Sequence, residues 1–324
     1  MTVKSRLLEL LEKNKGETVS GEAVAQELQC TRAAVWKAAK SLREEGYTIE
    51  AGPNKGYRLL KDNNRLSAEG IRSYLNNRDV FLKIYKEAES TNQAAKQAAV
   101  SKQAGHGSMI LAERQTEGRG RRGRAFYSPE GAGLYLSIIL EPGETLQESL
   151  LLTTAAAVAV HKAVQRLCNI SLDIKWVNDL YLNNKKVCGI LTEAITDFES
   201  GNIEFAVVGI GLNLYEVKGG YPPELQGIAG ALYPNEEAAS GVNRNHLAAE
   251  ILNTLLEETR NLSLSPYYIR HNIIPGKHIQ ILDGTRTRRA YARAIHPDGR
   301  LLVEEEDGTE TLLSYGEVSV CPES

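Results

Sequence analysis

The chain has 324 residues, of which 42% are hydrophobic and 24% charged, so it is long enough for more than one domain and apolar enough for ordinary packed cores. This composition excludes an intrinsically disordered chain. The formal net charge is −3, so contact with nucleic acid would have to come from a local basic patch and not from the chain as a whole.

The cysteines and the first residues of the chain indicate an intracellular protein. Cys30, Cys168, Cys188 and Cys321 are scattered without a CxxC pair, which argues against a zinc site and against a disulfide framework. We expect free thiols in a reducing cytosol. No run of about 18 apolar residues occurs, so we expect neither a signal peptide nor a membrane span, and a cytoplasmic location.

Residues 1–65 predict a winged helix-turn-helix domain, in which three helices precede a β-hairpin. The first helix has a stripe of leucines: Leu7, Leu8, Leu10 and Leu11. A second helix is expected over residues 21–28, and Thr31 is expected to cap a third. The apolar residues of the third helix recur at helical spacing: Val35, Ala38, Ala39 and Leu42. The hairpin is expected to join residues 47–50 to residues 57–59 through a turn at 52–56.

The third helix and the hairpin both carry basic residues. Residues 1–65 contain 12 Lys or Arg against 9 Asp or Glu, a local surplus of positive charge. An interaction module with a solvated basic face is the alternative, but the helix order with the wing favours DNA binding. We expect seven residues to contact DNA: Thr31, Arg32, Ala33, Trp36, Lys37, Lys40 and Lys55.

A polar stretch over residues 61–65 is expected to link this domain to an α+β domain with a mixed sheet over residues 66–272. The second domain alternates helices, such as 146–167, with strand-like runs at 80–85, 108–113, 133–140, 172–176, 186–193 and 205–214. Residues 273–324 predict a small β-barrel, with strands at 278–282, 289–295, 301–305 and 311–313.

The segment from Gly118 to Arg124 places four arginines among three glycines. It contains GxGxxG literally, but a dinucleotide-binding fingerprint needs a helix that opens at the third glycine, and residues 125–129 argue against one. Glycine lets the backbone approach a ligand, and the guanidinium group binds carboxylate or phosphate in pairs of hydrogen bonds. An RGG-like tail is the alternative, but the segment lies between two apolar strands, so we predict an anion-binding site.

Two further motifs end or begin strands. Asn178 and Asp179 follow a predicted strand, where Asn178 is suited to a phosphate or base edge and Asp179 to Mg²⁺ or a ribose hydroxyl. An Asn-Asp pair alone is more often only a turn. Lys186 begins a buried strand, where a lysine is costly unless it is paired with an anion.

Glycines and hydroxyls mark two more positions. Gly209 and Gly211 interrupt an apolar strand that ends in Asn213, which indicates close approach either of a ligand or of a packed neighbour. Ser90 and Thr91 precede a helix, so one of them serves either as its N-cap or as a hydrogen-bonding partner of a polar ligand.

Taken in chain order, these motifs closely resemble those of the biotin protein ligases: residues 89–92, 118–124, 175–179, 186–189 and 209–213. The winged helix and the barrel resemble the bifunctional bacterial members that also repress the biotin operon. The resemblance implies a central domain similar to class II synthetases and a C-terminal SH3-like barrel. It also implies that ATP activates biotin to biotinyl-5′-AMP, from which biotin passes to a lysine of an acceptor protein.

The resemblance assigns the site residues as follows. Biotin would be bound by Ser90, Thr91, Asn92, Gln115, Arg119, Gly120, Arg121, Lys186 and Gly189. The nucleotide would be bound by Arg121, Arg122, Arg124, Lys175, Asn178, Asp179 and Asn213, with Asp179 also a ligand of Mg²⁺. The catalytic residues would be Lys186, Arg121 and Arg119, since joining a carboxylate to a phosphate brings two anions together.

The resemblance also implies partners and a mobile loop. The acceptors would be the biotin carboxyl carrier protein of acetyl-CoA carboxylase and other carboxylases such as pyruvate carboxylase. A homodimer formed on ligand binding would bind palindromic operator DNA. The 118–124 loop is expected to be disordered without ligand and to close over the reactive anhydride. Val177 stands where the family usually has Pro, and we expect it to alter the turn without touching the ligand.

Two other functions remain open from the sequence. A lipoate or octanoate ligase has the same sheet and the same adenylate chemistry, although the full Gly-Arg loop with Lys175 to Asp179 is not expected there. A repressor whose central domain only senses a small molecule is the second alternative.

Overall fold

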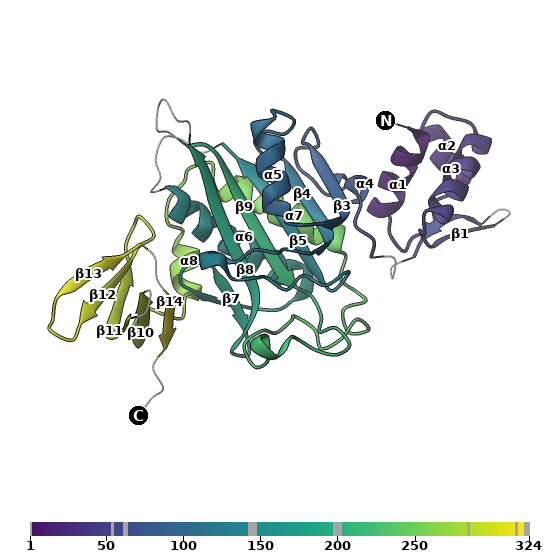
Figure 1. The fold of residues 1–324 in the computed structure, drawn as a ribbon. Helices are drawn as coiled ribbons and strands as arrows, with labels where there is room; N and C mark the ends of the chain where they lie inside the picture. Colours follow the sequence, from purple (N-terminus) through teal and green to yellow (C-terminus); the bar gives the residue numbers. More distant parts are fainter. Residues whose placement is uncertain are drawn as a thin grey trace.

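The computed structural model describes residues 2–52, 55–60, 64–141, 148–196, 203–283, 286–314 and 317–320. Three parts follow one another along the molecule in Figure 1. A small helical domain lies at one end, a larger domain built on a β-sheet lies in the middle, and a second sheet lies at the other end.

The N-terminal domain has the predicted winged helix-turn-helix order. Its elements are α1 (Val3–Lys13), α2 (Gly21–Glu27), α3 (Arg32–Glu44), β1 (Ile49–Gly52) and β2 (Gly56–Leu59). Thr31 caps α3 as predicted, because its Oγ1 accepts a hydrogen bond from the backbone N–H of Ala34 (3.2 Å). The predicted leucine stripe of α1 and the apolar face of α3 meet in a core separate from that of the rest of the chain. Residues 53–54 of the turn and 61–63 of the linker lie outside the described residues.

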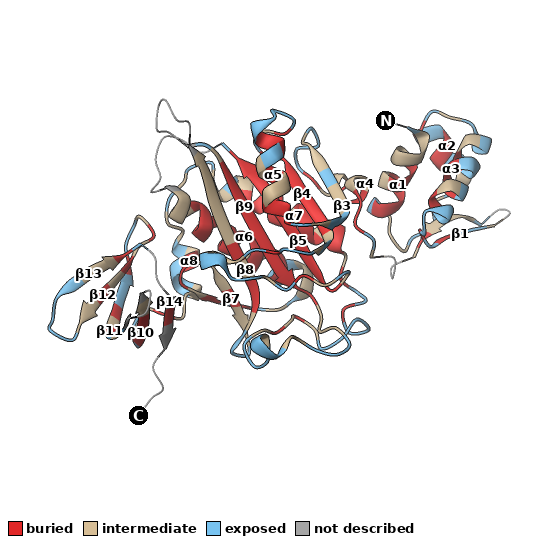
Figure 2. Cartoon of the chain, in the orientation of Figure 1, coloured by how far each residue is buried: buried red, intermediate tan, exposed pale blue. Residues whose placement is uncertain are grey.

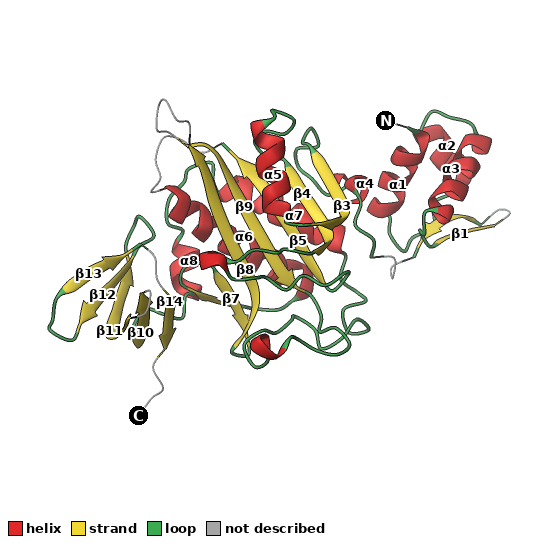
Figure 3. Ribbon diagram, in the orientation of Figure 1, coloured by secondary structure: helices red, strands yellow, loops and turns green. Residues whose placement is uncertain are grey.

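The central domain contains a mixed sheet of seven strands in the order β3-β4-β5-β9-β8-β7-β6 (Figure 3). β3 and β4 are parallel, and the other neighbours are antiparallel. The strands are β3 (Leu82–Ala88), β4 (Met109–Gln115), β5 (Gly133–Leu140), β6 (Asp173–Lys175), β7 (Asp179–Leu182), β8 (Lys185–Thr196) and β9 (Ile203–Asn213). The six predicted runs correspond to six of these strands, whereas β7 was not predicted.

Helices cover both faces of this sheet. α5 (Thr91–Val100) packs on one face through its alanines, against Ile110, Ile139 and Val207. α6 (Glu148–Cys168) and α7 (Arg244–Glu258) cover the other face, and the strands between the two layers are buried along most of their length (Figure 2). The domain also contains the short helices α4 (Ala68–Arg72) and α8 (Pro266–His271) and the 3₁₀ turn η2 (Pro223–Leu225).

The C-terminal part is an antiparallel sheet of five strands in the order β13-β12-β11-β10-β14. The strands are β10 (Lys277–Asp283), β11 (Arg286–Ile295), β12 (Leu301–Glu305), β13 (Glu310–Leu313) and β14 (Glu317–Val320). The sequence predicted the first four, and closure of the sheet into an SH3-like barrel stays a prediction. Among the described residues, no helix is both long and apolar enough to cross a membrane.

Candidate active site

The structure brings the predicted ligand-binding motifs together in one pocket of the central domain. The pocket is lined by all of the residues predicted for biotin and the nucleotide: Ser90, Thr91, Asn92, Gln115, Arg119, Gly120, Arg121, Arg122, Arg124, Lys175, Asn178, Asp179, Lys186, Gly189 and Asn213. These residues come from the start of α5, the end of β4, the loop after it, strands β6 to β9, and the turn between β6 and β7. Residues far apart in the sequence therefore share one cavity.

A chain of hydrogen bonds fixes the polar groups at the start of α5. The side-chain Oε1 of Gln115 accepts hydrogen bonds from the backbone N–H of Thr91 (2.8 Å) and from its hydroxyl (3.1 Å). At the other end of the amide, Nε2 of Gln115 donates to Oγ of Ser128 (2.9 Å). Ser137, which is fully buried, lies within hydrogen-bond distance of both Thr91 Oγ1 (2.8 Å) and Asn92 Oδ1 (2.6 Å). The amide orientation of Gln115 is thus determined by its neighbours.

The side chain of Ser90 is free of one of the two roles left open for it. Ser90 occupies the N-cap position of α5, but its side chain makes no capping hydrogen bond. It is buried and lines the pocket. The hydroxyl is therefore better suited to a ligand than to the helix.

The glycines of β8 and β9 allow two side chains to lie directly on the sheet. A Cβ atom on Gly211 would lie 2.4 Å from the ring of Phe126, and one on Gly209 would lie 2.1 Å from Oδ1 of Asn92. Gly189 pairs with Gly211 across β8 and β9 and faces the same ring. The glycines therefore have a packing role, and this packing forms one wall of the pocket.

The 118–124 loop lies over the pocket without forming a helix at Gly123. It contains the single 3₁₀ turn η1 (Arg121–Gly123), which is consistent with rejecting a dinucleotide-binding fingerprint. Arg121 turns inward and donates from Nη1 to Oδ1 of Asn178 (3.0 Å), and burial lowers the pKa of its guanidinium group. Arg122 reaches the C-terminal sheet, where its Nη1 donates to the backbone oxygen of Leu282 (3.2 Å). Arg119 and Arg124 are exposed at the pocket rim.

Lys186 has the anionic partner that its position requires. Its Nζ lies 2.6 Å from Oδ1 of Asp179, and both side chains are partly exposed to the pocket. Lys175 lies over the ring of Tyr181, with its Nζ 5.2 Å from the ring centroid. Asn213 is held by a hydrogen bond from Nδ2 to the backbone oxygen of Gly230 (2.9 Å). Basic groups and amides thus surround a single carboxylate.

Asp179 is the only acidic residue among the described residues that line the pocket. Mg²⁺ commonly binds proteins through one or two carboxylates and completes its shell with phosphates and water. No group of three potential metal-binding residues occurs in the described part of the chain. The residues present therefore fit a magnesium ion that is held mainly by the phosphates of a nucleotide and only in part by Asp179.

Val177 does not line the pocket, whereas Trp176 and Asn178 on either side of it do. The peptide bond between Trp176 and Val177 is cis, and the Val177 side chain is buried. The indole of Trp176 donates from Nε1 to the backbone oxygen of Gly299 in the C-terminal part (2.9 Å). The expectation that Val177 avoids direct ligand contact agrees with this placement.

Several pocket residues were not predicted from the sequence. Aromatic and aliphatic side chains complete the walls: Phe126, Tyr127, Tyr221, Leu225, Ile228 and Val318. Phe126 and Tyr127 directly follow the Gly-Arg loop, so their position in the sequence was a usable signal. The segment around Ile228 pairs with Lys186 through backbone hydrogen bonds, and nothing in its composition indicated this.

The residues predicted to contact DNA lie away from this pocket, on the N-terminal domain. Thr31, Arg32, Ala33, Trp36, Lys37 and Lys40 are all exposed on α3 or at its cap, and Lys55 is exposed on the hairpin. The indole of Trp36 is 59% exposed, which is unusual for so large an apolar side chain. An exposed surface of this kind on the third helix is what a recognition helix requires.

Comparisons with known proteins cover all three parts of the chain. The sequence pattern of the biotin/lipoate A/B protein ligase family matches residues 85–213. A helix-turn-helix domain pattern matches residues 3–58, and the pattern of the biotin protein ligase C-terminal domain matches residues 275–320. Among solved structures, a biotin protein ligase from Aquifex aeolicus in complex with biotin and ATP is 26% identical, with a TM-score of 0.61 over 74% of this chain and 99% of that chain.

Two full-length relatives extend the match to the whole molecule. The bifunctional ligase/repressor BirA of Bacillus subtilis is 33% identical, and the match covers 97% of this chain and 97% of that protein. BirA of Escherichia coli is 30% identical over 98% of this chain and 97% of that protein. The chain therefore belongs to the biotin protein ligase family, among the members that carry an N-terminal helix-turn-helix domain.

Proposed function

We propose that this protein activates biotin with ATP to biotinyl-5′-AMP, transfers biotin to a lysine of an acceptor protein, and represses transcription with the same intermediate as corepressor. It is a biotin protein ligase and a DNA-binding repressor, as its relatives are named. The observation that carries the proposal is that Arg119, Arg121 and Lys186 line the same pocket as Thr91 and Gln115.

The polar residues at the start of α5 suit the ureido ring of biotin. That ring offers one carbonyl acceptor and two N–H donors. Ser90 and Thr91 supply hydroxyls, Gln115 supplies an amide whose orientation is already fixed, and the ring of Phe126 supplies an apolar wall. A ligand with this pattern of donors and acceptors would leave few buried polar groups unpaired.

The basic residues suit the first chemical step. An oxygen of the biotin carboxylate attacks the α-phosphorus of ATP, the new C–O–P link forms, and the bond to pyrophosphate breaks. Arg119, Arg121 and Lys186 would offset the repulsion between the two anions and stabilise the charge that develops. Arg121 is already held by Asn178, so little reorganisation is needed. A bound Mg²⁺, held by the phosphates and Asp179, would neutralise the leaving pyrophosphate.

The second step uses the same pocket without ATP. The amine of an acceptor lysine attacks the carbonyl carbon of the mixed anhydride, an amide bond forms, AMP leaves, and the amine loses its proton. Arg122 and Val318 place the C-terminal sheet beside the loop that would shield the anhydride from water. The acceptors we propose are the biotin carboxyl carrier protein of acetyl-CoA carboxylase and related carboxylases such as pyruvate carboxylase, in the cytoplasm.

The exposed face of α3 supports the repressor function. We propose that biotinyl-5′-AMP favours a homodimer whose two winged helices bind a palindromic operator. Fluorescence anisotropy of an operator fragment from a biotin-synthesis gene, with and without biotin and ATP, tests this proposal. Binding that does not respond to biotin and ATP would contradict the corepressor role.

Biotin-dependent exchange of labelled pyrophosphate into ATP tests the ligase function. We expect exchange in the wild type and a loss of about 10²-fold or more in Lys186→Ala. Lys185→Ala is the matched control, because Lys185 is the exposed neighbour and does not line the pocket. Absence of exchange in the wild type would leave a ligand-sensing repressor, and exchange with lipoate in place of biotin would identify a lipoate ligase.

A further inference from the structure

The first turn of α7 joins the ligase domain to the linker and the DNA-binding domain. Four consecutive residues take part: Asn243, Arg244, Asn245 and His246. Asn243 caps the helix by accepting a hydrogen bond from the backbone N–H of His246 (3.2 Å). All four side chains make contacts outside α7, and neither the sequence motifs nor the proposed chemistry accounts for these contacts.

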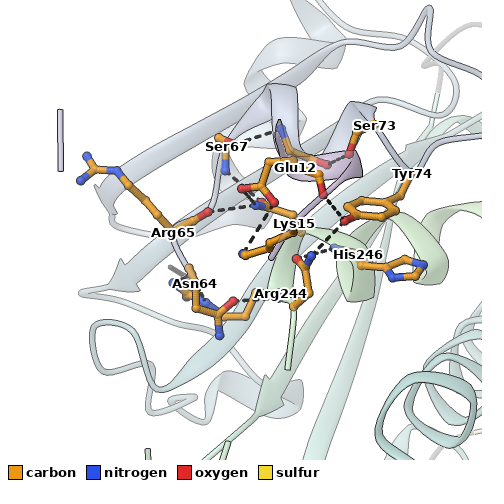
Figure 4. Close-up of polar contacts among 12 residues, drawn as sticks. Glu12, Lys15, Asn64, Arg65, Ser67, Ser73, Tyr74, Arg244 and His246 are labelled. Carbon is orange, nitrogen blue, oxygen red and sulfur yellow. Dashed lines mark hydrogen bonds and ion pairs between the residues drawn. The ribbon is translucent and has the colours of Figure 1, made fainter. Parts of the chain in front are cut away.

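Arg244 is buried, with only 6% of its surface exposed, and its guanidinium group contacts three separate segments. Nε and Nη2 donate to the backbone oxygen of Asn64 in the linker (3.0 and 2.7 Å). Nη1 and Nη2 pair with both carboxylate oxygens of Glu113 in β4 (2.7 and 3.2 Å). Nη1 also lies 3.3 Å from the backbone oxygen of Gly133, where β5 begins. Figure 4 shows Arg244 beside Asn64.

The strands that Arg244 contacts lead directly to the ligand pocket. Glu113 lies two residues before Gln115, which is the last residue of β4. The side-chain amide of Gln115 accepts a hydrogen bond from the backbone N–H of Thr91. Gly133 pairs with Asn213 of β9, which lines the pocket. The Glu113 carboxylate also accepts a hydrogen bond from the backbone N–H of Leu66 (3.3 Å), the residue directly after the linker, so this end of the linker is tied to β4 both through Arg244 and next to Leu66. A bidentate pair of this kind fixes both distance and orientation.

Asn245 makes the corresponding contacts to the N-terminal domain. Its Nδ2 donates to Oε1 of Glu12 in α1 (3.2 Å) and to the backbone oxygen of Arg65 (2.9 Å), and its Oδ1 accepts from the backbone N–H of Ser67 (3.0 Å). Glu12 is fully buried, and burial raises the pKa of its carboxyl group. The carboxyl group therefore depends on Asn245 and Lys15 for polar partners.

Tyr74 and His246 complete the contact. The Tyr74 hydroxyl donates to the backbone oxygen of Glu12 (2.6 Å), and its ring stacks on His246 at a centroid distance of 4.2 Å. Burial raises the pKa of Tyr74 to about 12, so the hydroxyl keeps its proton at neutral pH. Figure 4 shows Glu12, Lys15 and Tyr74 gathered at this junction. The junction is mostly polar, so it specifies one orientation of the two domains.

We propose that Arg244 is a positioning residue for the biotin site, and that Asn245 beside it couples that site to the orientation of the DNA-binding domain. The inference rests on the proposed function. The linker cannot move relative to β4 and β5 without breaking bonds to Arg244, and α1 cannot move relative to α7 without breaking bonds to Asn245. Ligand binding at Gln115 and operator binding at α3 are thereby linked through adjacent residues of one helix turn.

The first test is Arg244→Lys, which keeps the charge but removes the paired donors. We expect the KM for biotin in pyrophosphate exchange to rise about tenfold, while kcat changes little, because the catalytic groups remain in place. Glu113→Gln should shift the KM in the same direction. Arg260→Lys is the matched control, since Arg260 is exposed just after the C-terminal end of α7. An unchanged KM, or an equal loss of kcat together with a lower Tm, would overturn the positioning role.

The second test separates coupling from catalysis. Asn245→Ala should leave the KM for biotin near that of the wild type but abolish the rise in operator affinity that biotin and ATP produce. Glu12→Gln retains an acceptor for Asn245 and should keep most of that rise. A full response to ligand in Asn245→Ala would overturn the coupling. A wild type without biotin-dependent exchange would instead disprove the proposed function, so the two failures are distinguishable.

Discussion

Nζ of Lys186 lies 2.6 Å from Oδ1 of Asp179, across neighbouring strands β8 and β7 of the central sheet. The ion pair places a lysine in the pocket without leaving a half-buried charge unpaired. It also means that the one acidic residue in the described pocket lining has two candidate partners, the lysine and a metal ion on the nucleotide.

Asp179→Asn should lower the rate of pyrophosphate exchange by at least about tenfold and raise the Mg²⁺ concentration at half-maximal rate, because an amide is a weaker ligand for Mg²⁺ than a carboxylate. The measurement is the exchange rate as a function of Mg²⁺ at saturating biotin. Asp173→Asn, at the exposed start of β6, is the control. An unchanged Mg²⁺ dependence would show that Asp179 serves only as the counter-ion of Lys186.

Gln115→Glu should raise the KM for biotin by about tenfold or more. The substitution removes the N–H donor that Nε2 provides to Ser128. It also places a negative charge beside Thr91, whose hydroxyl in the wild type donates to a neutral amide oxygen. Steady-state exchange at varied biotin measures the effect. Gln103→Glu adds the same charge at an exposed position and should leave the KM unchanged. Equal KM values for the two variants would show that Gln115 does not contribute to biotin binding.

Gly211→Ala should abolish most ligase activity, because the new methyl group would lie 2.4 Å from the ring of Phe126 and displace it from the sheet. The double variant Gly211→Ala with Phe126→Ala relieves the clash and should recover part of the folding stability but little of the biotin affinity. Gly241→Ala is a suitable control, since its Cβ would meet no atom within 4 Å. Thermal unfolding and biotin titration distinguish the two effects.

Lys37→Ala should weaken operator binding at every sequence tested and lower the slope of log affinity against log salt by about one, as expected for the loss of a phosphate contact. Pyrophosphate exchange should stay at the wild-type rate, because Lys37 lies on the exposed face of α3. Lys13→Ala removes the same charge from the end of α1 and should change neither measurement. A salt slope equal to that of the wild type would place Lys37 outside the DNA contact.

His161 should make the protein less stable in mild acid. Its ring is fully buried against Tyr267, and burial lowers its pKa below the usual value. Below about pH 6.5 the unfolded chain binds a proton that the folded chain does not, so stability falls as pH falls towards the lowered pKa. In His161→Gln the loss of Tm between pH 7 and pH 5.5 should be smaller than in the wild type. His106→Gln, at an exposed position, should show the wild-type loss.

Much of the fold was predictable because local patterns determine local structure. The leucine stripe of α1 and the Thr31 cap predicted the N-terminal helices, and the mostly apolar run of residues 133–140 predicted β5 with its observed bounds. β7 was not predicted because an Asn-Asp pair such as the one ending in Asp179 is typical of a turn, and because β7 is only four residues long. β14 was missed for a similar reason, since Glu317–Val320 is short and follows no clear turn signal.

The motifs that line the pocket were predictable from the sequence. A glycine loop rich in arginine, and a lysine at the start of a buried strand, are rarely needed for packing alone. The walls of the pocket were not predictable, since Phe126, Ile228 and Val318 are apolar residues that any core could use. The junction at Arg244 and Asn245 was also invisible in the sequence. Its partners Asn64 and Glu113 lie more than a hundred residues away, and only the folded chain brings them together.

The two tryptophans of the chain report separately on the two domains. Trp36 is 59% exposed on the recognition helix, whereas Trp176 is 4% exposed beside the ligand pocket. A buried indole emits at shorter wavelength and is protected from iodide, while an exposed indole is readily quenched. Trp36→Phe would leave a protein whose tryptophan fluorescence comes only from Trp176 beside the pocket, and Trp176→Phe would leave tryptophan fluorescence only from Trp36 on α3. Both occupancies could then be followed without a synthetic label.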